Sequence, residues 1–155
     1  MKITRRDFLK KTATGVALAG VSAGLPVNVF ANEKTIKIGM NIPMTGDYAP
    51  WGLPGLYGCE IIANDINAAG GVRIGNTDYK IEMISFDHAY DTEKTIQGYK
   101  KLVLEDGVKM VMMLGGSTVS SILPWAQRKK MLTTTLLPSD ITPKSEYLIA
   151  TCESH

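Results

Sequence analysis

The feature that most constrains this chain is a regular alternation, from residue 36 onward, of short apolar runs with amphipathic stretches. The run at 108–114, VKMVMML, is almost continuously apolar, which is typical of a parallel strand covered on both faces. A repeated β-α-β order implies a parallel sheet with right-handed crossovers and helices on both sides. We therefore predict an α/β, doubly wound fold with strands at 36–42, 79–86, 108–114, 131–137 and 147–151 and helices at 54–69, 92–105 and 120–130.

Residues 1–31 are expected to be an export signal and not part of the fold. Arg5 and Arg6 stand in the motif TRRDFLK, and a mildly apolar run follows at 13–25. This pattern is typical of a twin-arginine signal, here with cleavage after Ala31. The alternative is an ordinary secretory signal in which two arginines occur by chance. The apolar run is shorter than the roughly 20 residues that span a bilayer, so a permanent anchor is not expected.

The charge that remains at 32–155 argues against a nucleic-acid partner. The signal carries five of the 17 Lys and Arg and one of the 15 Asp and Glu, which leaves 12 positive and 14 negative residues. The basic run 128–130 falls in the last turn of a predicted helix, where cations suit the helix dipole. We expect 32–155 to form one domain and a monomer in the periplasm.

Cysteines and histidines are too few for a metal or cofactor site. Cys59 lies on the apolar face of a predicted helix, so a free thiol is favoured over a disulfide with Cys152, which remains the alternative. No cysteine pair motif or His/Cys cluster is present. His88 and His155 are the only histidines, and we predict no cofactor and no metal.

Three loops of the predicted fold meet at one edge of the sheet. In open parallel sheets ligands bind beyond the carboxyl ends of the strands where the winding reverses, and in strand order 2-1-3-4-5 this point lies between the first and third strands. The loops concerned are 43–53, 115–120 and 138–143. Their candidate ligand contacts are Tyr48 and Trp51, then Ser117, Thr118, Ser120 and Ser121, then Ser139, Asp140 and Thr142.

These side chains suit a small polar or zwitterionic ligand. Backbone N–H groups at the helix start, with nearby hydroxyls, can hold a carboxylate, and Asp140 can accept from an ammonium or amide. Trp51 offers a flat apolar wall, with Tyr48 beside it. Each residue also has a structural alternative, because Ser and Thr cap helices, Asp in a turn bonds its own backbone, and a Trp can plug a loop. The convergence of three loops favours the site.

Several motifs together resemble a known family. IKIGMNIPMTGDYAPWG leads into a helix that ends in DINAAGG, the second strand ends in FDHAYD, and VKMVMMLGG precedes a Ser/Thr-rich turn. They are similar to the extracytoplasmic solute-binding proteins of branched-chain amino acid type ABC transporters, whose relatives also bind amides, urea and aromatic acids. The resemblance covers about residues 34–151.

The resemblance implies a type I periplasmic binding fold that holds its ligand between two lobes and delivers it to an ABC permease. It points to Thr118, Ser120, Ser139, Asp140, Thr142 and Trp51 as ligand contacts. The acidic residue stands where the family has a Ser-Ala-Thr turn, which disfavours a plain leucine-like ligand. We expect the chain to hold the signal and most of lobe one, with the second lobe missing. Binding by 32–155 alone should then be weak or undetectable.

Two other classes remain as alternatives. An exported oxidoreductase would fit a twin-arginine signal, but no G-x-G-x-x-G follows the first strand, which reads GMNIPMTG. His88 has no Ser or Cys neighbour in sequence to activate, so a surface or capping role is favoured over catalysis. The ligand-sensing domain of a receptor would use the same fold.

Overall fold

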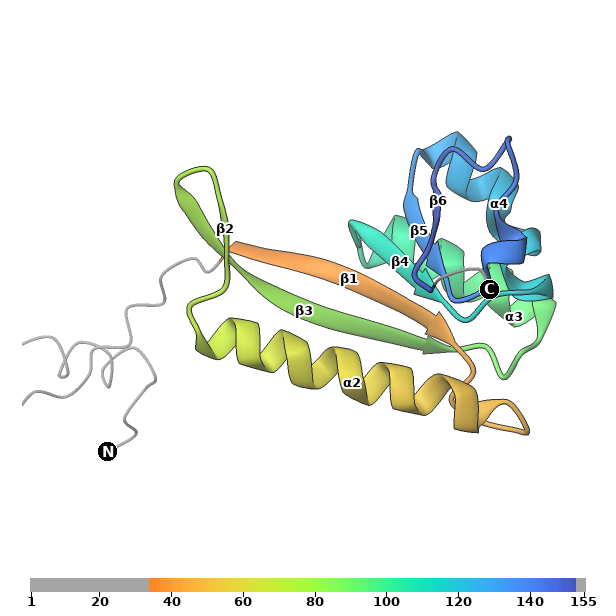
Figure 1. The fold of residues 1–155 in the computed structure, drawn as a ribbon, viewed down its shortest axis with the longest axis horizontal. Coiled ribbons are helices and arrows are strands. Elements are labelled where there is room, and N and C mark those ends of the chain that lie inside the picture. Colours follow the sequence, from red (N-terminus) through yellow and green to blue (C-terminus); the bar gives the residue numbers. More distant parts are fainter. Residues whose placement is uncertain (1–33, 153–155) are drawn as a thin grey trace, which may run out of the picture. The chain divides into compact units, whose positions relative to one another are not determined.

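A computed structural model describes residues 34–152 of the 155-residue chain (Figure 1). The predicted signal, with Arg5, Arg6 and cleavage after Ala31, lies outside the described residues. Within them, no helix is long and apolar enough to cross a bilayer. The elements are β1 (Lys34–Ile42), α2 (Ala49–Ala68), β2 (Val72–Ile74), β3 (Thr77–Asp87), α3 (Thr92–Lys100), a π-helical turn (Lys101–Glu105), β4 (Met110–Met113), α4 (Ser117–Lys129), β5 (Leu132–Thr135), a 3-10 turn (Pro138–Asp140) and β6 (Leu148–Ala150).

The strands form one sheet in the order β2-β3-β1-β4-β5-β6. Every neighbouring pair is parallel except β2 and β3, which form an antiparallel hairpin at one edge. The five parallel strands follow the order 2-1-3-4-5, which confirms the predicted doubly wound α/β fold. The sequence prediction lacks β2, because three residues are too short a run for strand alternation to be recognised.

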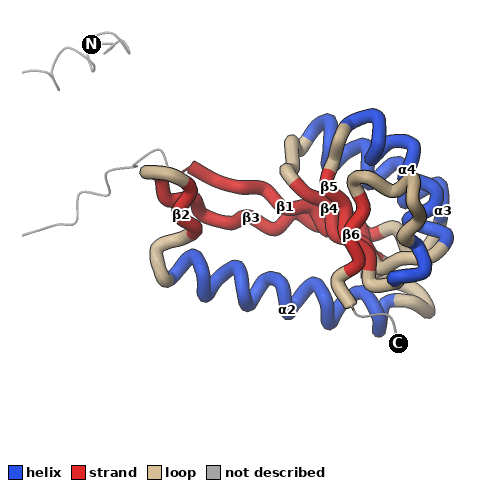
Figure 2. Tube along the Cα trace, turned by 45° about the horizontal axis from the view of Figure 1, so that its top comes forward, coloured by secondary structure: helices blue, strands red, loops and turns tan. Residues whose placement is uncertain are grey.

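The two faces of the sheet are covered by different helices (Figure 2). Helix α2 packs along β1 and β3 on one face, where Met40 and Ile42 contact Leu56. Asn41, which lies between Met40 and Ile42 in β1, points to the opposite face of the sheet, as alternation in a strand requires. There, Asn41 Nδ2 donates a hydrogen bond of 2.9 Å to the carbonyl of Thr95 in α3. Helices α3 and α4 therefore cover the second face.

The largest apolar cluster lies between the sheet and the pair α3 and α4. Tyr99, Leu102, Val111 and Ile122 are almost completely buried in it. The Tyr99 hydroxyl lies 2.8 Å from Thr133 Oγ1, which ties α3 to β5. Burial raises the pKa of Tyr99 to about 12, so the ring stays neutral at any physiological pH.

Helix α2 begins at Ala49, five residues earlier than predicted. Pro50 suits the first turn, where its missing N–H would have no helical partner. Gly52 lets the helix pass close to the preceding loop, since a Cβ there would lie 1.9 Å from the carbonyl oxygen of Pro43. Trp51 consequently stands on the first turn of α2 and not in a loop, which corrects the prediction.

The buried face of α2 includes only part of its apolar residues. Leu56 and Ala63 are buried, but Ile62 is 60% exposed. Cys59 is half-buried, and both it and Cys152 are free thiols. The structure thus confirms that the two cysteines are unpaired. The face of α2 that is buried against the sheet does not include Ile62.

The starts of α3 and α4 differ in how they are capped. Asp91 caps α3, because its carboxylate accepts from the Lys94 N–H at 2.8 Å. Helix α4 begins at Ser117, three residues before the predicted start, and its cap position is Gly116 with a φ of 68°. Thr118 therefore lies inside the helix and does not cap it.

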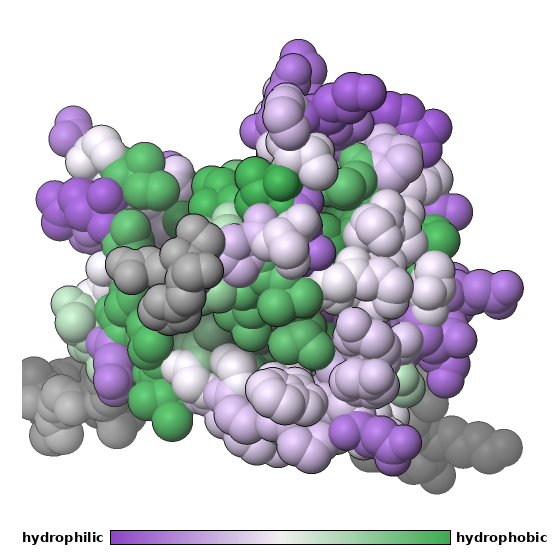
Figure 3. Space-filling view, turned by 45° about the vertical axis from the view of Figure 1, so that its right-hand side comes forward, coloured by the Kyte–Doolittle hydropathy of each residue, from purple (hydrophilic) through white to green (hydrophobic). Residues whose placement is uncertain are grey.

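One half of the α2 side of the sheet has no helix over it among the described residues. Met110 of β4 pairs with Leu132 of β5, and Met112 pairs with Thr134, which pairs in turn with Ile149 of β6. These residues share one face, and Leu132 and Ile149 are exposed. Figure 3 shows several groups of hydrophobic side chains on this side of the molecule, separated by less hydrophobic residues.

Candidate ligand-binding site

Two predicted aromatic contacts come together at the carboxyl ends of the parallel strands. Trp51, on the first turn of α2, is 70% exposed, and Tyr48, in the cap position before it, is 45% exposed. The Tyr48 ring stacks on Tyr90, with ring centroids 3.9 Å apart and planes inclined by 16°. Tyr90 follows β3 and is absent from the sequence-based site. The edge therefore carries three aromatic rings where the sequence predicts two.

The loop after β1 is held to the end of β3 by Asp87. Its carboxylate accepts from the Met44 N–H at 2.8 Å, the Thr45 hydroxyl at 2.6 Å and the Ala89 N–H at 2.8 Å. Partial burial alone would raise the pKa of Asp87, but the hydrogen bonds from Thr45, Met44 and Ala89 outweigh it and lower the pKa below its ordinary value. Asp87 therefore stays ionised and fixes the approach to α2.

A strained turn after β3 places Tyr90. The Asp91 N–H donates to the His88 carbonyl at 2.7 Å, and the two residues between them, Ala89 and Tyr90, have φ of 47° and 61°. Such left-handed backbone is unfavourable for side chains other than Gly, Asn and Asp. The turn persists because Asp87 accepts from Ala89, as described above, and His88 Nδ1 accepts from the Tyr90 N–H at 2.9 Å.

His88 is fully buried and has no free ring nitrogen. Since Nδ1 accepts from Tyr90, the proton of the neutral ring is on Nε2, which lies 3.1 Å from the Asn41 carbonyl and donates to it. Burial lowers the pKa of His88, which favours this neutral state. His88 is thus a buried structural group that shapes the turn, and the predicted surface position is wrong.

The hydroxyls after β4 bond to the chain's own carbonyls. Thr118 is buried and donates to the Gly115 carbonyl at 2.7 Å, and Ser121 donates to the Thr118 carbonyl at 2.7 Å. Ser120 donates to the Ser117 carbonyl at 3.0 Å. Ser117 and Ser120 are exposed at the start of α4. The side chain of Thr118 is the one that the fold removes most fully from solvent.

Asp140, after β5, lies against the start of α4. Its Oδ2 accepts from the Gly116 N–H at 3.0 Å and from the Thr135 hydroxyl at 2.6 Å. Its carboxylate therefore lies near the positive end of α4, where the sequence suggests a site for a ligand carboxylate. Ser139 and Thr142 are exposed, and Thr142 Oγ1 lies 2.9 Å from Ser145 Oγ.

A cavity of about 260 Å³ lies between the three aromatic rings and the ends of β4 and β5. We call it the aromatic cavity. Of the residues predicted as ligand contacts, Tyr48 and Trp51 line it, whereas none of the Ser, Thr and Asp residues does. Its further walls are apolar side chains, whose place in the site the sequence pattern does not reveal because they look like strand ends. The lining residues are Tyr48, Trp51, Tyr90, Leu114, Gly115, Leu136 and Leu137.

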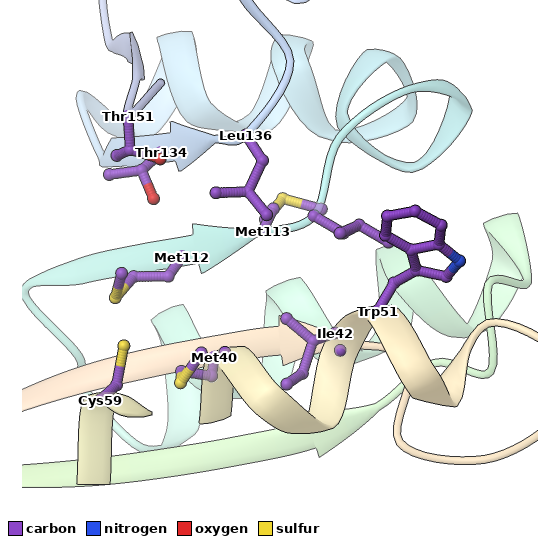
Figure 4. A pocket seen from close by; sticks show the side chains of 12 residues that line it. Met40, Ile42, Trp51, Cys59, Met112, Met113, Thr134, Leu136 and Thr151 are labelled. Atoms are coloured by element: carbon purple, nitrogen blue, oxygen red, sulfur yellow. The ribbon is translucent and has the colours of Figure 1, made fainter. Parts of the chain in front are cut away.

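A second, narrower groove of about 110 Å³ runs from Trp51 along α2 over the sheet (Figure 4). Figure 4 shows Trp51 where β1 and β4 end, while Met40, Cys59 and Met112 lie farther along the groove. These side chains belong to the apolar α2 side of the sheet. Among the described residues, no group of three or more His, Cys, Asp or Glu side chains is placed to hold a metal ion.

Comparison with known proteins gives consistent similarities. The sequence profile of the family described as "Periplasmic binding protein" matches residues 35–153. A Leu/Ile/Val-binding protein of Citrobacter freundii is 34% identical over 98 residues, which cover 63% of this chain and 25% of that protein. This chain therefore spans about a quarter of the length of that relative.

Solved structures show the same architecture. The branched-chain amino acid transporter substrate binding protein LivJ from Streptococcus pneumoniae, in complex with isoleucine, superposes with a TM-score of 0.65 at 25% identity over 76% of this chain and 33% of that one. A solute binding protein of an ABC transporter from Rhodopseudomonas palustris BisB5, in complex with 3,4-dihydroxy benzoic acid, gives a TM-score of 0.61 at 27% identity, covering 77% and 32%.

Proposed function

Because this chain belongs to the periplasmic binding protein family, we propose that the protein is the substrate-binding component of an ABC transporter. In this role it captures a small solute outside the cytoplasm and presents it to a permease in the inner membrane. Residues 1–31 would direct its export by the twin-arginine machinery, with removal of the signal after Ala31. The relatives reported above are solute-binding proteins, and the proposed role involves no chemical step.

One observation of the structure carries the proposal. The aromatic cavity lies at the carboxyl ends of β1, β4 and β5, where the winding of the sheet reverses. Ligands of open parallel sheets bind at this position. Trp51 and Tyr48 reach it from the start of α2, and both are exposed enough to meet a solute. His88, by contrast, is enclosed and both its ring nitrogens are hydrogen-bonded.

We propose Trp51 and Tyr48 as solute contacts, with the exposed hydroxyls of Ser117, Ser120 and Ser139 as further polar partners at the rim. The solute is a branched-chain amino acid, an amide, urea or an aromatic acid. The isoleucine and dihydroxybenzoic acid complexes of the two structural neighbours support this range. Thr118 and Asp140 would act on binding indirectly, by holding the loops after β4 and β5.

The described lobe supplies only one wall of the proposed site. A solute on the aromatic cavity would remain open to solvent on the other side, and the relatives are several times longer than the matched segment. A second lobe that closes over the solute would bury it and supply the missing contacts. For residues 32–155 alone we therefore expect binding that is weak or undetectable.

A ligand screen tests the proposal. The protein, expressed at the length that its gene encodes, is heated with amino acids, amides, urea and aromatic acids, since a bound ligand raises the melting temperature. We expect one class to give a saturable shift that Trp51→Ala abolishes. Tyr57→Ala, which removes an exposed ring of α2 outside the cavity, is the matched control. If no class shifts the melting temperature, or if Trp51→Ala leaves the shift unchanged, the proposed function is refuted.

A further inference from the structure

The chemistry of the aromatic cavity narrows the kind of solute that fits it. Every side chain that lines the cavity is aromatic or aliphatic, and no charged group is among them. Its volume of about 260 Å³ is below the range of about 300–1,000 Å³ typical of sites for drug-sized ligands. It therefore has room for a group about the size of a single ring, and its walls offer contact area in place of hydrogen bonds.

Several polar groups beside the cavity are already engaged. Asp140 accepts from the Gly116 N–H, just before α4 begins. The hydroxyls of Thr118 and Ser121 donate to backbone carbonyls. A charged group placed inside the aromatic cavity would lose hydration without gaining a charged partner among the lining residues.

Tyr90 is held in the cavity wall from three sides. Its backbone sits in the strained turn stabilised by His88, and its ring stacks on Tyr48. Its hydroxyl lies so close to Gly116 that a Cβ at that glycine would approach it to 2.7 Å. Unfavourable backbone geometry persists where the surrounding structure enforces it, and it is concentrated at functional sites. Here the enforced conformation gives the aromatic wall a fixed position.

We propose, on the basis of the proposed function, that Tyr90 is a specificity-determining residue and that the solute is a single-ring aromatic compound. Its ring lies in the aromatic cavity against Trp51 and the Tyr48–Tyr90 pair, and its polar substituent points out of the cavity. A planar ring makes full contact with a wall of planar rings and gains edge and face interactions with them. A puckered or branched aliphatic group of the same size touches the same wall at fewer points.

Calorimetry on the unmodified protein, at the length that its gene encodes, tests the ligand class. Benzoate and cyclohexanecarboxylate carry the same charge on six-membered rings and differ in planarity and in π electrons. We expect benzoate to bind about tenfold more tightly than cyclohexanecarboxylate. Equal affinities would overturn the inference. Tight binding of isoleucine without binding of benzoate would overturn it too and leave the proposed function intact, whereas binding of no solute in the panel would refute both.

Substitution of Tyr90 tests the residue. Asn tolerates left-handed backbone, so Tyr90→Asn keeps the turn and removes the ring. We expect this change to weaken benzoate binding about tenfold, while Tyr90→Phe, which keeps the stacked ring, stays near the unmodified affinity. Tyr57→Ala should have no effect. Unchanged benzoate affinity in a folded Tyr90→Asn variant would overturn the role of Tyr90, and the ligand comparison above does not depend on any variant folding.

Discussion

Asp140 connects two of the loops at the site through the hydrogen bonds that it accepts. The sequence allows either a ligand contact or a local structural role for an acidic residue in this turn. In the structure its partners are Gly116, which precedes α4, and Thr135, which ends β5. The side chain thus fixes the floor of the cavity, and its effect on a solute is through the position of these loops.

Removal of the Asp140 carboxylate should therefore cost stability. Asp140→Ala leaves the Gly116 N–H and the Thr135 hydroxyl without their acceptor, and we expect the free energy of unfolding to fall by about 1–2 kcal/mol. Asp140→Asn keeps an acceptor oxygen of the same shape and should recover part of the loss. Urea denaturation measures both variants. An Asp140→Ala variant as stable as the parent would contradict the assigned hydrogen bonds.

His88 makes the stability of the fold depend on pH. Its pKa in the folded chain is lowered by burial from the ordinary value of 6.5, despite the opposing effect of the hydrogen bond to Asn41 and the negative charges of Asp87 and Asp91. Above pH 6.5 the ring is neutral in both the folded and the unfolded chain, and its contribution to the free energy of unfolding is fully present. As the pH falls from 6.5 toward the lower folded value, the unfolded chain binds the proton first, and stability is lost.

We expect the free energy of unfolding to decline between pH 7 and pH 5, and the decline to be smaller in His88→Gln. The carboxylate of Asp87 acts in a separate window, because its pKa is lowered from 3.8 and its contribution is lost only in more acidic solution. Urea denaturation at several pH values checks both statements. Identical pH slopes for the parent and His88→Gln would show that the ring does not carry the effect.

At the scale of elements, the start of α2 decides where Trp51 stands. Two glycines of this helix make a matched pair of tests. A Cβ at Gly52 would collide with the Pro43 carbonyl, whereas nothing lies within 4 Å of a Cβ at Gly58. We expect Gly52→Ala to lower the free energy of unfolding by about 2 kcal/mol or more, and Gly58→Ala to raise it by about 0.5–1 kcal/mol.

Thermal or urea unfolding of the two variants distinguishes these effects. If Gly52→Ala lowers the free energy of unfolding and Gly58→Ala raises it, the close contact with the loop, and not helix propensity, governs residue 52. If both variants were stabilised, the loop would have to lie farther from α2 than the structure places it.

The sequence predicts the order and direction of the five parallel strands because apolar runs and glycine stops mark them clearly. It misses the first turn of α2, since Pro50, Gly52 and Pro54 together favour a loop over a helix on local propensity. It also misses Tyr90, because propensity disfavours left-handed backbone for Tyr and only the contacts with Asp87 and His88 stabilise it there. The sequence predicts that Ser and Thr hydroxyls follow β4. It does not predict which groups they bond, because these partners depend on where α4 begins.

At the scale of the whole described part, the uncovered half of the sheet exposes apolar side chains to solvent. The faces of parallel sheets are normally covered on both sides, and here Leu132, Ile149 and their neighbours are open on the α2 side. Contiguous exposed apolar surface promotes association. A polypeptide limited to residues 32–155 should therefore bind a hydrophobic fluorescent dye and self-associate.

Charged substitutions test this expectation. Leu132→Lys together with Ile149→Lys places two cations on the open face, and both side chains are already exposed, so folding should be retained. Light scattering should show a smaller species, and dye fluorescence should fall. A parent polypeptide 32–155 that is monomeric and binds no dye would contradict the description of this face.

In the proposed function, a small solute binds at the carboxyl edge of the sheet against Trp51. Residues 1–155 hold two tryptophans, Trp51 and Trp125, so in Trp125→Phe, with any tryptophan beyond these residues also replaced by Phe, the emission comes from Trp51 alone. Titration of this variant, at the length that its gene encodes, with the solute that raises the melting temperature should shift the emission saturably and protect Trp51 from a dissolved quencher. If the solute stabilises the protein while the emission and quenching of Trp51 stay unchanged, the site lies elsewhere and the account is wrong.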